Sequence, residues 1–160
     1  MPLSPDLPEG LDPKPASLGA FGHVDDSPFS AQMIAGMDQL SEAQAVVELR
    51  RWSIESLSLH TGQSVLEVGC GPGAMSLALA DAVGKTGAVN GIDNSRVMVA
   101  EARRRSANQP QVNFDTGDAQ ELPFPDGVFD ASYSERVFQH LDSPGTAFQE
   151  MLRVLRRGAG

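Results

Sequence analysis

The sequence has few of the residues that build cross-links, metal sites and basic surfaces. Its single cysteine, Cys70, excludes an intramolecular disulfide and a cysteine-based zinc site, so we expect no bound metal. Only 12 Lys and Arg stand against 21 Asp and Glu, for a formal net charge of −9. That balance disfavours phosphate backbones and anionic membranes, so we expect no nucleic-acid partner. No apolar run approaches the roughly 18 residues of a spanning helix, which argues against membrane insertion.

The remaining composition is that of an ordinary globular domain. Hydrophobic residues make up 41% of the 160 residues and charged residues 21%, which suffices for one buried core. Prolines recur over residues 1–28 without an apolar period, which predicts a disordered or loosely packed arm, with a lid over a ligand site as the alternative. Residues 29–160 are predicted to form the domain. Because no N-terminal targeting signal is evident, we expect a cytoplasmic protein.

Short apolar runs alternate with helical patterns along the domain. The predicted strands are 64–68, 88–92, 112–115 and 129–133; the predicted helices are 73–83, 95–107 and one that begins at Ser143-Pro144 and is closed by Gly158. This alternation predicts an α/β fold with a doubly wound, Rossmann-like, mostly parallel sheet and helices on both faces. We expect the strand order third, second, first, fourth, with a ligand site beyond the carboxyl ends of the strands.

Two helical patterns precede the first strand. The stretch FSAQMIAGM predicts a short helix, and Ser41 with Gln44 has the capping-box spacing for a second helix to about Leu57. Three consecutive arginines, 103–105, close the predicted helix 95–107, where their charge suits the helix dipole. A solvated helix end is favoured there over an anion site.

A glycine-rich turn, VLEVGCGPGA, follows the first predicted strand. The dinucleotide fingerprint G-x-G-x-x-G/A can be laid on Gly69, Gly71 and Ala74, and Asp93 follows at the distance of a ribose-binding acid. On these residues alone, a nicotinamide-dependent oxidoreductase is one interpretation. The turn by itself does not separate that interpretation from a site for S-adenosylmethionine.

Four ordered motifs favour the second interpretation. Glu67, Gly69, Gly71 and Gly73 read E-x-G-x-G-x-G, followed by VNGIDNS, FDTGDAQELPFPDGVFDASYSERVFQHL and FQEMLRVLRRGAG. In this order the chain resembles the class I S-adenosylmethionine-dependent methyltransferases over about residues 65–160. It is most similar to the small-molecule group that includes the ubiquinone and menaquinone biosynthesis methyltransferases. The resemblance implies S-adenosylmethionine as cofactor and a small molecule as methyl acceptor.

The resemblance implies a role for each acid near a strand end. The glycine turn would face the methionine carboxylate with its N–H groups, and Glu67 would hold the ammonium. Asp93 would accept the ribose hydroxyls, and Asp118 the adenine amino group beside the Ala119 backbone. Asn94 stands where such enzymes often place an apolar residue against adenine. The structural alternatives are a polar strand end for Glu67, a helix N-terminal acid for Asp93 and a turn residue for Asp118.

The residues after the fourth strand are candidates for the acceptor side. His140 is the candidate general base because histidine titrates near neutral pH, and the alternative is a histidine that shapes its loop. Tyr133, Ser134 and Glu135 are expected along the cofactor or acceptor pocket, with Ser134 counted among the cofactor-binding residues. Tyr133 as a core strand residue is equally compatible with the sequence.

The chain is short at its C-terminus relative to the family the motifs resemble. The fourth strand is therefore expected at the edge of the sheet, where a homodimer could form by strand pairing. The alternatives are a partial version of a larger enzyme and a module that binds S-adenosylmethionine without catalysing transfer.

Overall fold

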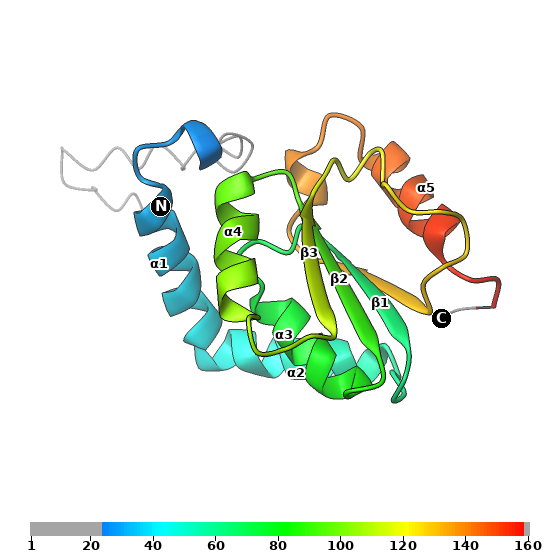
Figure 1. Ribbon diagram of the computed structural model, residues 1–160. Coiled ribbons are helices and arrows are strands. Elements are labelled where there is room, and N and C mark those ends of the chain that lie inside the picture. Colours follow the sequence, from blue (N-terminus) through cyan, green and yellow to red (C-terminus); the bar gives the residue numbers. More distant parts are fainter. Residues whose placement is uncertain (1–23, 159–160) are drawn as a thin grey trace, which may run out of the picture.

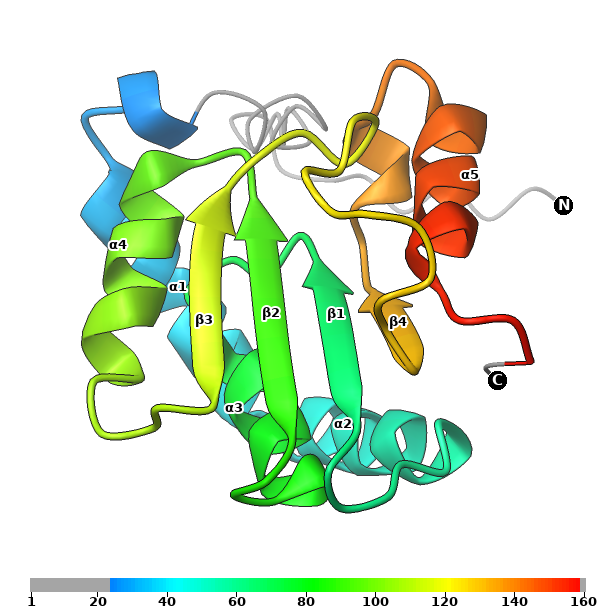
Figure 2. The same cartoon turned by 45° about the vertical axis from the view of Figure 1, so that its right-hand side comes forward.

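The computed structural model describes residues 24–158. Its elements in chain order are α1 (Ser30–Glu42), α2 (Gln44–Ser56), β1 (Ser64–Val68), α3 (Ala74–Val83), β2 (Ala88–Asp93), α4 (Arg96–Arg105), β3 (Val112–Thr116), β4 (Ala131–Ser134), the 3-10 helix η2 (Phe138–His140) and α5 (Pro144–Val154). The strands form one parallel sheet in the order β3-β2-β1-β4, and Figure 2 shows all four pointing the same way. The doubly wound fold and the strand order predicted from the sequence are confirmed.

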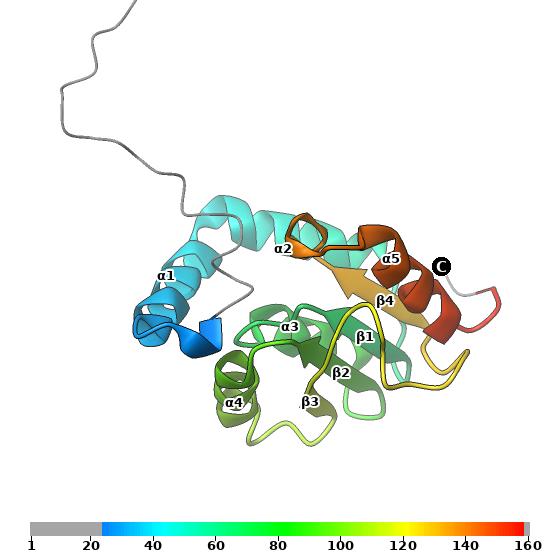
Figure 3. The same cartoon turned by 90° about the horizontal axis from the view of Figure 1, so that it is seen from above.

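Alternate residues of the strands pack into two cores, one on each face of the sheet. Val65 and Val89 belong to the core beneath α3 and α4, whereas Leu66 and Ile92 belong to the core beneath α5. This period of two makes both faces apolar, as a sheet covered by helices on both sides requires. Figures 1 and 3 show α5 on the opposite side of the sheet from α3 and α4. The strands are thereby held in a rigid frame from whose carboxyl ends loops emerge together.

The two N-terminal helices differ from the sequence prediction. One helix, α1, runs from Ser30 through Glu42 and contains Ser41, so the predicted capping box at Ser41 and Gln44 is wrong. The chain breaks at Ala43, whose backbone is extended and which caps α2 without a side-chain hydrogen bond. Ser41 instead accepts a hydrogen bond of 2.6 Å from the guanidinium of Arg50. Tertiary packing of the two helices has overridden the local capping signal.

The fourth strand and the last helix are shorter than predicted. β4 begins at Ala131, because the N–H groups of Val128 and Phe129 donate to the carbonyl of Val154, at 2.9 and 3.0 Å, instead of entering the sheet. α5 ends at Val154, so Arg156 lies beyond the helix and pairs with Asp130. Within residues 24–158, β4 has a strand partner only in β1 and is an edge strand, as expected.

Helix α4 begins with a side-chain cap and ends with three paired arginines. Ser95 accepts a hydrogen bond of 3.2 Å from the N–H of Met98. The three arginines are all ion-paired, in the pairs Arg103–Asp115, Arg104–Glu101 and Arg105–Asp38. The anion site considered as an alternative is therefore not formed, and the last of these pairs ties α4 to α1.

Most of the arm predicted over residues 1–28 lies outside the described residues. Of the remainder, Val24 is buried and Asp25 accepts a hydrogen bond from the hydroxyl of Ser95, the N-cap of α4. Within residues 24–158, no helix is long and apolar enough to cross a membrane.

Candidate functional site

A cavity of about 990 Å³ opens at the carboxyl ends of the strands. Parallel pairing aligns Val68 of β1 with Ile92 of β2 and Ser134 of β4, so the residues after each strand meet at one edge of the sheet. Eight of the ten predicted site residues line the cavity: Glu67, Gly69, Gly71, Asp93, Asn94, Asp118, Ala119 and His140. Gly73 and Ser134 are not among its lining residues.

The glycine turn needs glycine at three positions because of its backbone. Gly69, Gly71 and Gly73 have φ values of 78°, 50° and 89°, which L side chains rarely adopt. A Cβ on Gly69 would lie 2.0 Å from a methyl group of Val137. On Gly73 it would lie 2.9 Å from the ring of Phe114. Gly73 therefore allows α3 to pack close to the sheet, which explains why it does not line the cavity.

The N–H groups from Gly69 to Gly73 are all used within the protein. Those of Gly69 and Cys70 donate to the carbonyl of Ile92, at 2.7 and 3.0 Å. The N–H of Gly71 donates to Asp93 Oδ2 at 2.8 Å, and that of Gly73 to the Cys70 carbonyl at 2.9 Å. Pro72 has no N–H. The prediction that these N–H groups face a carboxylate is therefore not supported by the geometry of the turn.

Glu67 lies at the end of β1 with its side chain almost fully enclosed. Its residue is 5% exposed, and its carboxylate accepts a hydrogen bond from the hydroxyl of Ser76 on α3. Burial raises the pKa of Glu67 to about 8 against the opposing effect of Ser76, and the negative charges of Asp93 and Glu135 raise it further. A cation bound in the cavity would favour the ionised form of this side chain.

Asp93, at the end of β2, is held in place by two backbone donors. Its Oδ2 accepts the N–H of Gly71 at 2.8 Å and its Oδ1 accepts the N–H of Ser95 at 2.9 Å. Burial raises the pKa of Asp93, and backbone hydrogen bonds from Ser95, Gly71 and Asn94 oppose that shift. A carboxylate offers about four acceptor positions, so each oxygen keeps one for a ligand hydroxyl. This arrangement fits a vicinal diol such as that of ribose.

Asp118 and Ala119 follow β3 in a tight turn. Asp118 Oδ1 accepts the N–H of Gln120 at 2.8 Å, and Asp118 pairs with Glu121 in an isolated bridge. The turn role considered as its alternative is thus present. Asp118 also lines the cavity, and its Oδ2 has no hydrogen-bond partner within residues 24–158. Asn94 lines the same cavity, between Asp93 and the cap of α4.

The residues after β4 contribute the other wall, whereas Tyr133 and Ser134, within β4, do not line the cavity. His140 closes η2 and lines the cavity, half-buried, with its Nε2 3.1 Å from the side-chain nitrogen of Gln139. The Tyr133 hydroxyl donates to Glu135 at 3.0 Å, and burial raises the pKa of this phenol. The hydroxyl oxygen of Ser134 is buried and, among the described residues, has no hydrogen-bond partner.

Several cavity residues come from helices that carried no motif. Met37 and Ser41 of α1, Arg50 of α2 and Val24 all line the cavity. Asp25 braces this wall: it accepts the Ser95 hydroxyl at 2.6 Å and the N–H groups of Arg96 and Val97 at 2.9 and 3.1 Å. The sequence offered no signal for these contacts, because they depend on how α1 and α2 pack across the glycine turn.

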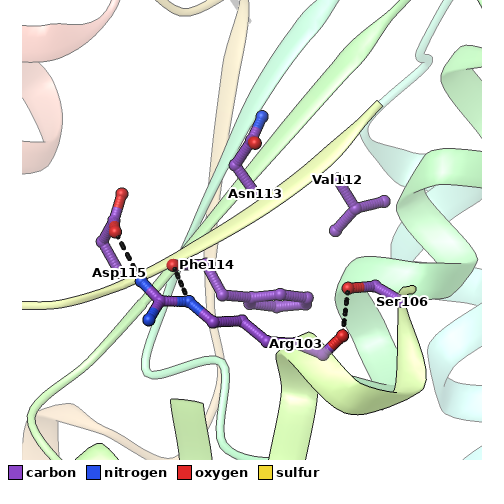
Figure 4. Close-up of a pocket in the computed structure, with 6 residues that line it drawn as sticks. All are labelled: Arg103, Ser106, Val112, Asn113, Phe114 and Asp115. Atoms are coloured by element: carbon purple, nitrogen blue, oxygen red, sulfur yellow. Dashed lines mark hydrogen bonds and ion pairs between the residues drawn. The ribbon is translucent and has the colours of Figure 1, made fainter. Parts of the chain in front are cut away.

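A second, smaller cavity of about 240 Å³ lies on the outer side of β3. Figure 4 shows it filled by internal contacts: Arg103 donates to the Phe114 carbonyl and to Asp115, both at 2.8 Å. The side chains of Arg103, Asp115 and Ser106 are already paired, so the candidate site is the large cavity. Within residues 24–158 no group of three or more His, Cys, Asp or Glu could hold a metal ion; the absence of a metal remains a prediction.

Comparison with known families gives one matching profile. Residues 65–158, more than half of the chain, match a family described as "Methyltransferase domain". Their first residue lies in the strand before the glycine turn and their last lies four residues beyond α5. The match therefore spans the first three motifs in full and the fourth as far as Gly158.

Curated relatives and solved structures agree with this match. The chain is 41% identical over 125 residues to an uncharacterised 37.1 kDa protein in transposon TN4556 of Streptomyces fradiae, covering 78% of this chain and 36% of that protein. It is 32% identical over 124 residues to demethylmenaquinone methyltransferase of Bacillus licheniformis, covering 76% and 53%. The chain thus spans about half or less of the length of these relatives.

Two crystal structures share the fold. One is an S-adenosylmethionine-dependent methyltransferase from Aquifex aeolicus, with a TM-score of 0.67 and 25% identity over 77% of this chain and 67% of that one. The other is the [4+2]-cyclase SpnF, with a TM-score of 0.64 and 35% identity over 71% and 42%.

Proposed function

We propose that this chain, which belongs to the class I S-adenosylmethionine-dependent methyltransferase family, transfers the methyl group of that cofactor to a small-molecule acceptor. S-adenosylmethionine is the cofactor of the family; when bound, it supplies a methyl group activated by a sulfonium. The proposal is carried by one observation: the cavity at the carboxyl ends of the strands is lined by eight of the ten residues that the family motifs single out.

The charged and polar groups of the cavity support an assignment of residues to each part of the cofactor. We propose that Asp93 accepts the ribose hydroxyls, since its two oxygens are fixed by backbone donors and keep acceptor capacity. Glu67 would receive the ammonium, which supplies the cation that a buried carboxylate lacks. Asp118, Asn94 and Ala119, at the ends of β3 and β2, would surround the adenine.

The acceptor side is supported by fewer contacts. His140 remains the proposed general base, because it lines the cavity on the β4 side and histidine titrates near neutral pH. Ser134 remains a proposed cofactor contact, supported by its buried hydroxyl oxygen without a hydrogen-bond partner among residues 24–158. The acceptor would enter beside η2, so these residues would align and desolvate the nucleophile.

Binding and turnover are tested separately. Isothermal titration with S-adenosylhomocysteine and NAD is expected to show binding of the first alone, and binding of NAD alone would contradict the proposal. Transfer of an isotopically labelled methyl group to quinone, phenol and amine acceptors tests turnover. An inactive protein that binds the cofactor would support the second candidate, a binding module without transfer. The similarity to SpnF, a cyclase, favours keeping that candidate.

The homodimer through the sheet edge is also a proposal. It is supported by β4, which among the described residues has a strand partner on one side only, although the segment around Leu155 covers the approach to it at Phe129. Sedimentation at micromolar concentration is expected to give a dimer, and a monomer would contradict this proposal. The cytoplasmic location and the absence of a nucleic-acid partner stay predictions.

A further inference from the structure

The methionine end of the cofactor carries a carboxylate that must find a partner in the cavity. In the glycine turn, the N–H groups of Gly69, Cys70, Gly71 and Gly73 are occupied by acceptors within the protein. The first N–H beyond the turn belongs to Ala74, the opening residue of α3, which lines the cavity. A helix N-terminus supplies a partial positive charge only. A full positive charge must come from a side chain.

Two arginines line the cavity, and they differ in their partners. Arg136 pairs with its neighbour Glu135 at 3.2 Å. Arg50 has no carboxylate within 4.0 Å among the described residues, and its guanidinium donates only to the hydroxyl of Ser41, at 2.6 Å. Ser41 also lines the cavity, so this hydrogen bond fixes the guanidinium at the cavity wall. A guanidinium has five N–H donors, most of which therefore remain for a ligand.

The position of Arg50 along the cavity is given by its electrostatic effect on Glu67. Arg50 and Glu67 both line the cavity, and the positive charge of Arg50 lowers the pKa of Glu67. Glu67 is the residue proposed to receive the ammonium. The carboxylate and the ammonium of an amino acid share one carbon atom, so a group that binds the carboxylate must lie close to a group that binds the ammonium.

We propose that Arg50 binds the carboxylate of the cofactor's methionine and that Ser41 orients its guanidinium. This inference rests on the proposed function only in taking S-adenosylmethionine as the ligand. It adds α2 to the cofactor site, and it replaces the glycine turn as the source of positive charge for the carboxylate.

The test compares two ligands and matched variants by isothermal titration. S-adenosylhomocysteine carries the carboxylate, and its decarboxylated analogue S-adenosyl-3-thiopropylamine keeps the amine and lacks it. Arg50→Met is expected to weaken S-adenosylhomocysteine binding by about tenfold to a hundredfold, the range for a charge-assisted hydrogen bond. The decarboxylated analogue is expected to bind Arg50→Met and wild type alike. Arg50→Lys is expected to recover part of the loss, because it restores the charge without the fork geometry.

Arg51→Met is the matched control. Arg51 is the next residue of α2, with a side chain 75% exposed and 3.9 Å from Glu55, outside the cavity. The affinity of the Arg51→Met variant for both ligands is expected to equal that of wild type. Equal losses of both ligands in Arg50→Met and in Arg50→Lys would overturn the inference, because they would indicate a change in cavity shape. Unchanged S-adenosylhomocysteine affinity in Arg50→Met would overturn it as well. A wild type that binds neither ligand would instead remove the proposed function itself.

Discussion

Replacing Glu67 by glutamine is expected to stabilise the protein at neutral pH while weakening cofactor binding. The carboxyl group is 5% exposed, and burial raises its pKa from 4.5 to about 8. In the unfolded chain the same group ionises near its ordinary pKa. Above pH 4.5 the folded state therefore holds a proton that the unfolded state has released, so the free energy of unfolding falls as pH rises towards 8.

The magnitude follows from the distance between the two pKa values. Each pH unit above 4.5 costs about 1.4 kcal/mol, which makes the loss at pH 7 about 3 kcal/mol. Glutamine carries no such cost, and its amide oxygen can still accept the hydroxyl of Ser76. The side-chain N–H group of the glutamine has no acceptor placed for it, which costs about 1 kcal/mol of stability. The variant Glu67→Gln should therefore be about 2 kcal/mol more stable at pH 7 and slightly less stable at pH 4.

Urea titrations of both proteins from pH 4 to pH 8 measure this difference. Other buried acids such as Asp93 titrate in both proteins, so the difference between them isolates Glu67. Glu42→Gln, an exposed change at the end of α1, serves as the control and is expected to show no pH-dependent difference. A difference between Glu67→Gln and wild type that stays flat from pH 5 to pH 8 would refute the reasoning, as would a variant less stable than wild type at pH 7.

Asp25→Asn is expected to lower the free energy of unfolding by about 1–2 kcal/mol in urea at pH 7, because the Ser95 hydroxyl and two N–H groups lose an ionised acceptor. Since these contacts lower the pKa of Asp25 to about 2, the difference should vanish as pH falls from about 4 towards 2; a constant difference would count against it. Gly69→Ala is expected to cost about 2 kcal/mol or more in urea, because its Cβ would lie 2.0 Å from Val137; wild-type stability would exclude this geometry. Gly36→Ala within α1, where a Cβ meets nothing within 4 Å, should gain about 0.4–1 kcal/mol, read as a higher Tm, and a lower Tm would contradict it.

The sheet was predictable because its signals are local. The run Ser64–Val68 followed by glycines has few structural alternatives, and the alternation of strands and helices leaves few topologies. The errors arose where a local signal competes with a tertiary one. Ser41 and Gln44 have the spacing of a capping box, yet α1 continues through Ser41, whose hydroxyl accepts a hydrogen bond from Arg50 instead.

The acids of the site were also predictable, since the end of a parallel strand fixes where Glu67 and Asp93 lie. Their partners were not. Gly71 donates to Asp93 although 22 positions separate them, and this contact removes from the turn the donor that the motif alone suggested for a ligand. The approach of Arg50 depends on the angle at which α2 crosses the sheet, and no spacing in the sequence records that angle.

Glu67 and Arg50 are each unfavourable on their own, and one bound amino-acid group would satisfy both. Glu67 is a buried carboxyl group without a cation within ion-pair distance, and Arg50 is a cavity-facing guanidinium without a carboxylate, both within residues 24–158. Each alone costs stability, because Glu67 must keep its proton above its ordinary pKa and the half-buried charge of Arg50 lacks a counter-charge. An amino-acid group offers an ammonium to the first and a carboxylate to the second on a single carbon atom. A dinucleotide offers only anionic phosphates here, which Glu67 would repel once ionised. If Glu67 and Arg50 bind the ligand as proposed, the two together favour an amino-acid zwitterion over a pyrophosphate, on grounds separate from the glycine turn that both ligands share.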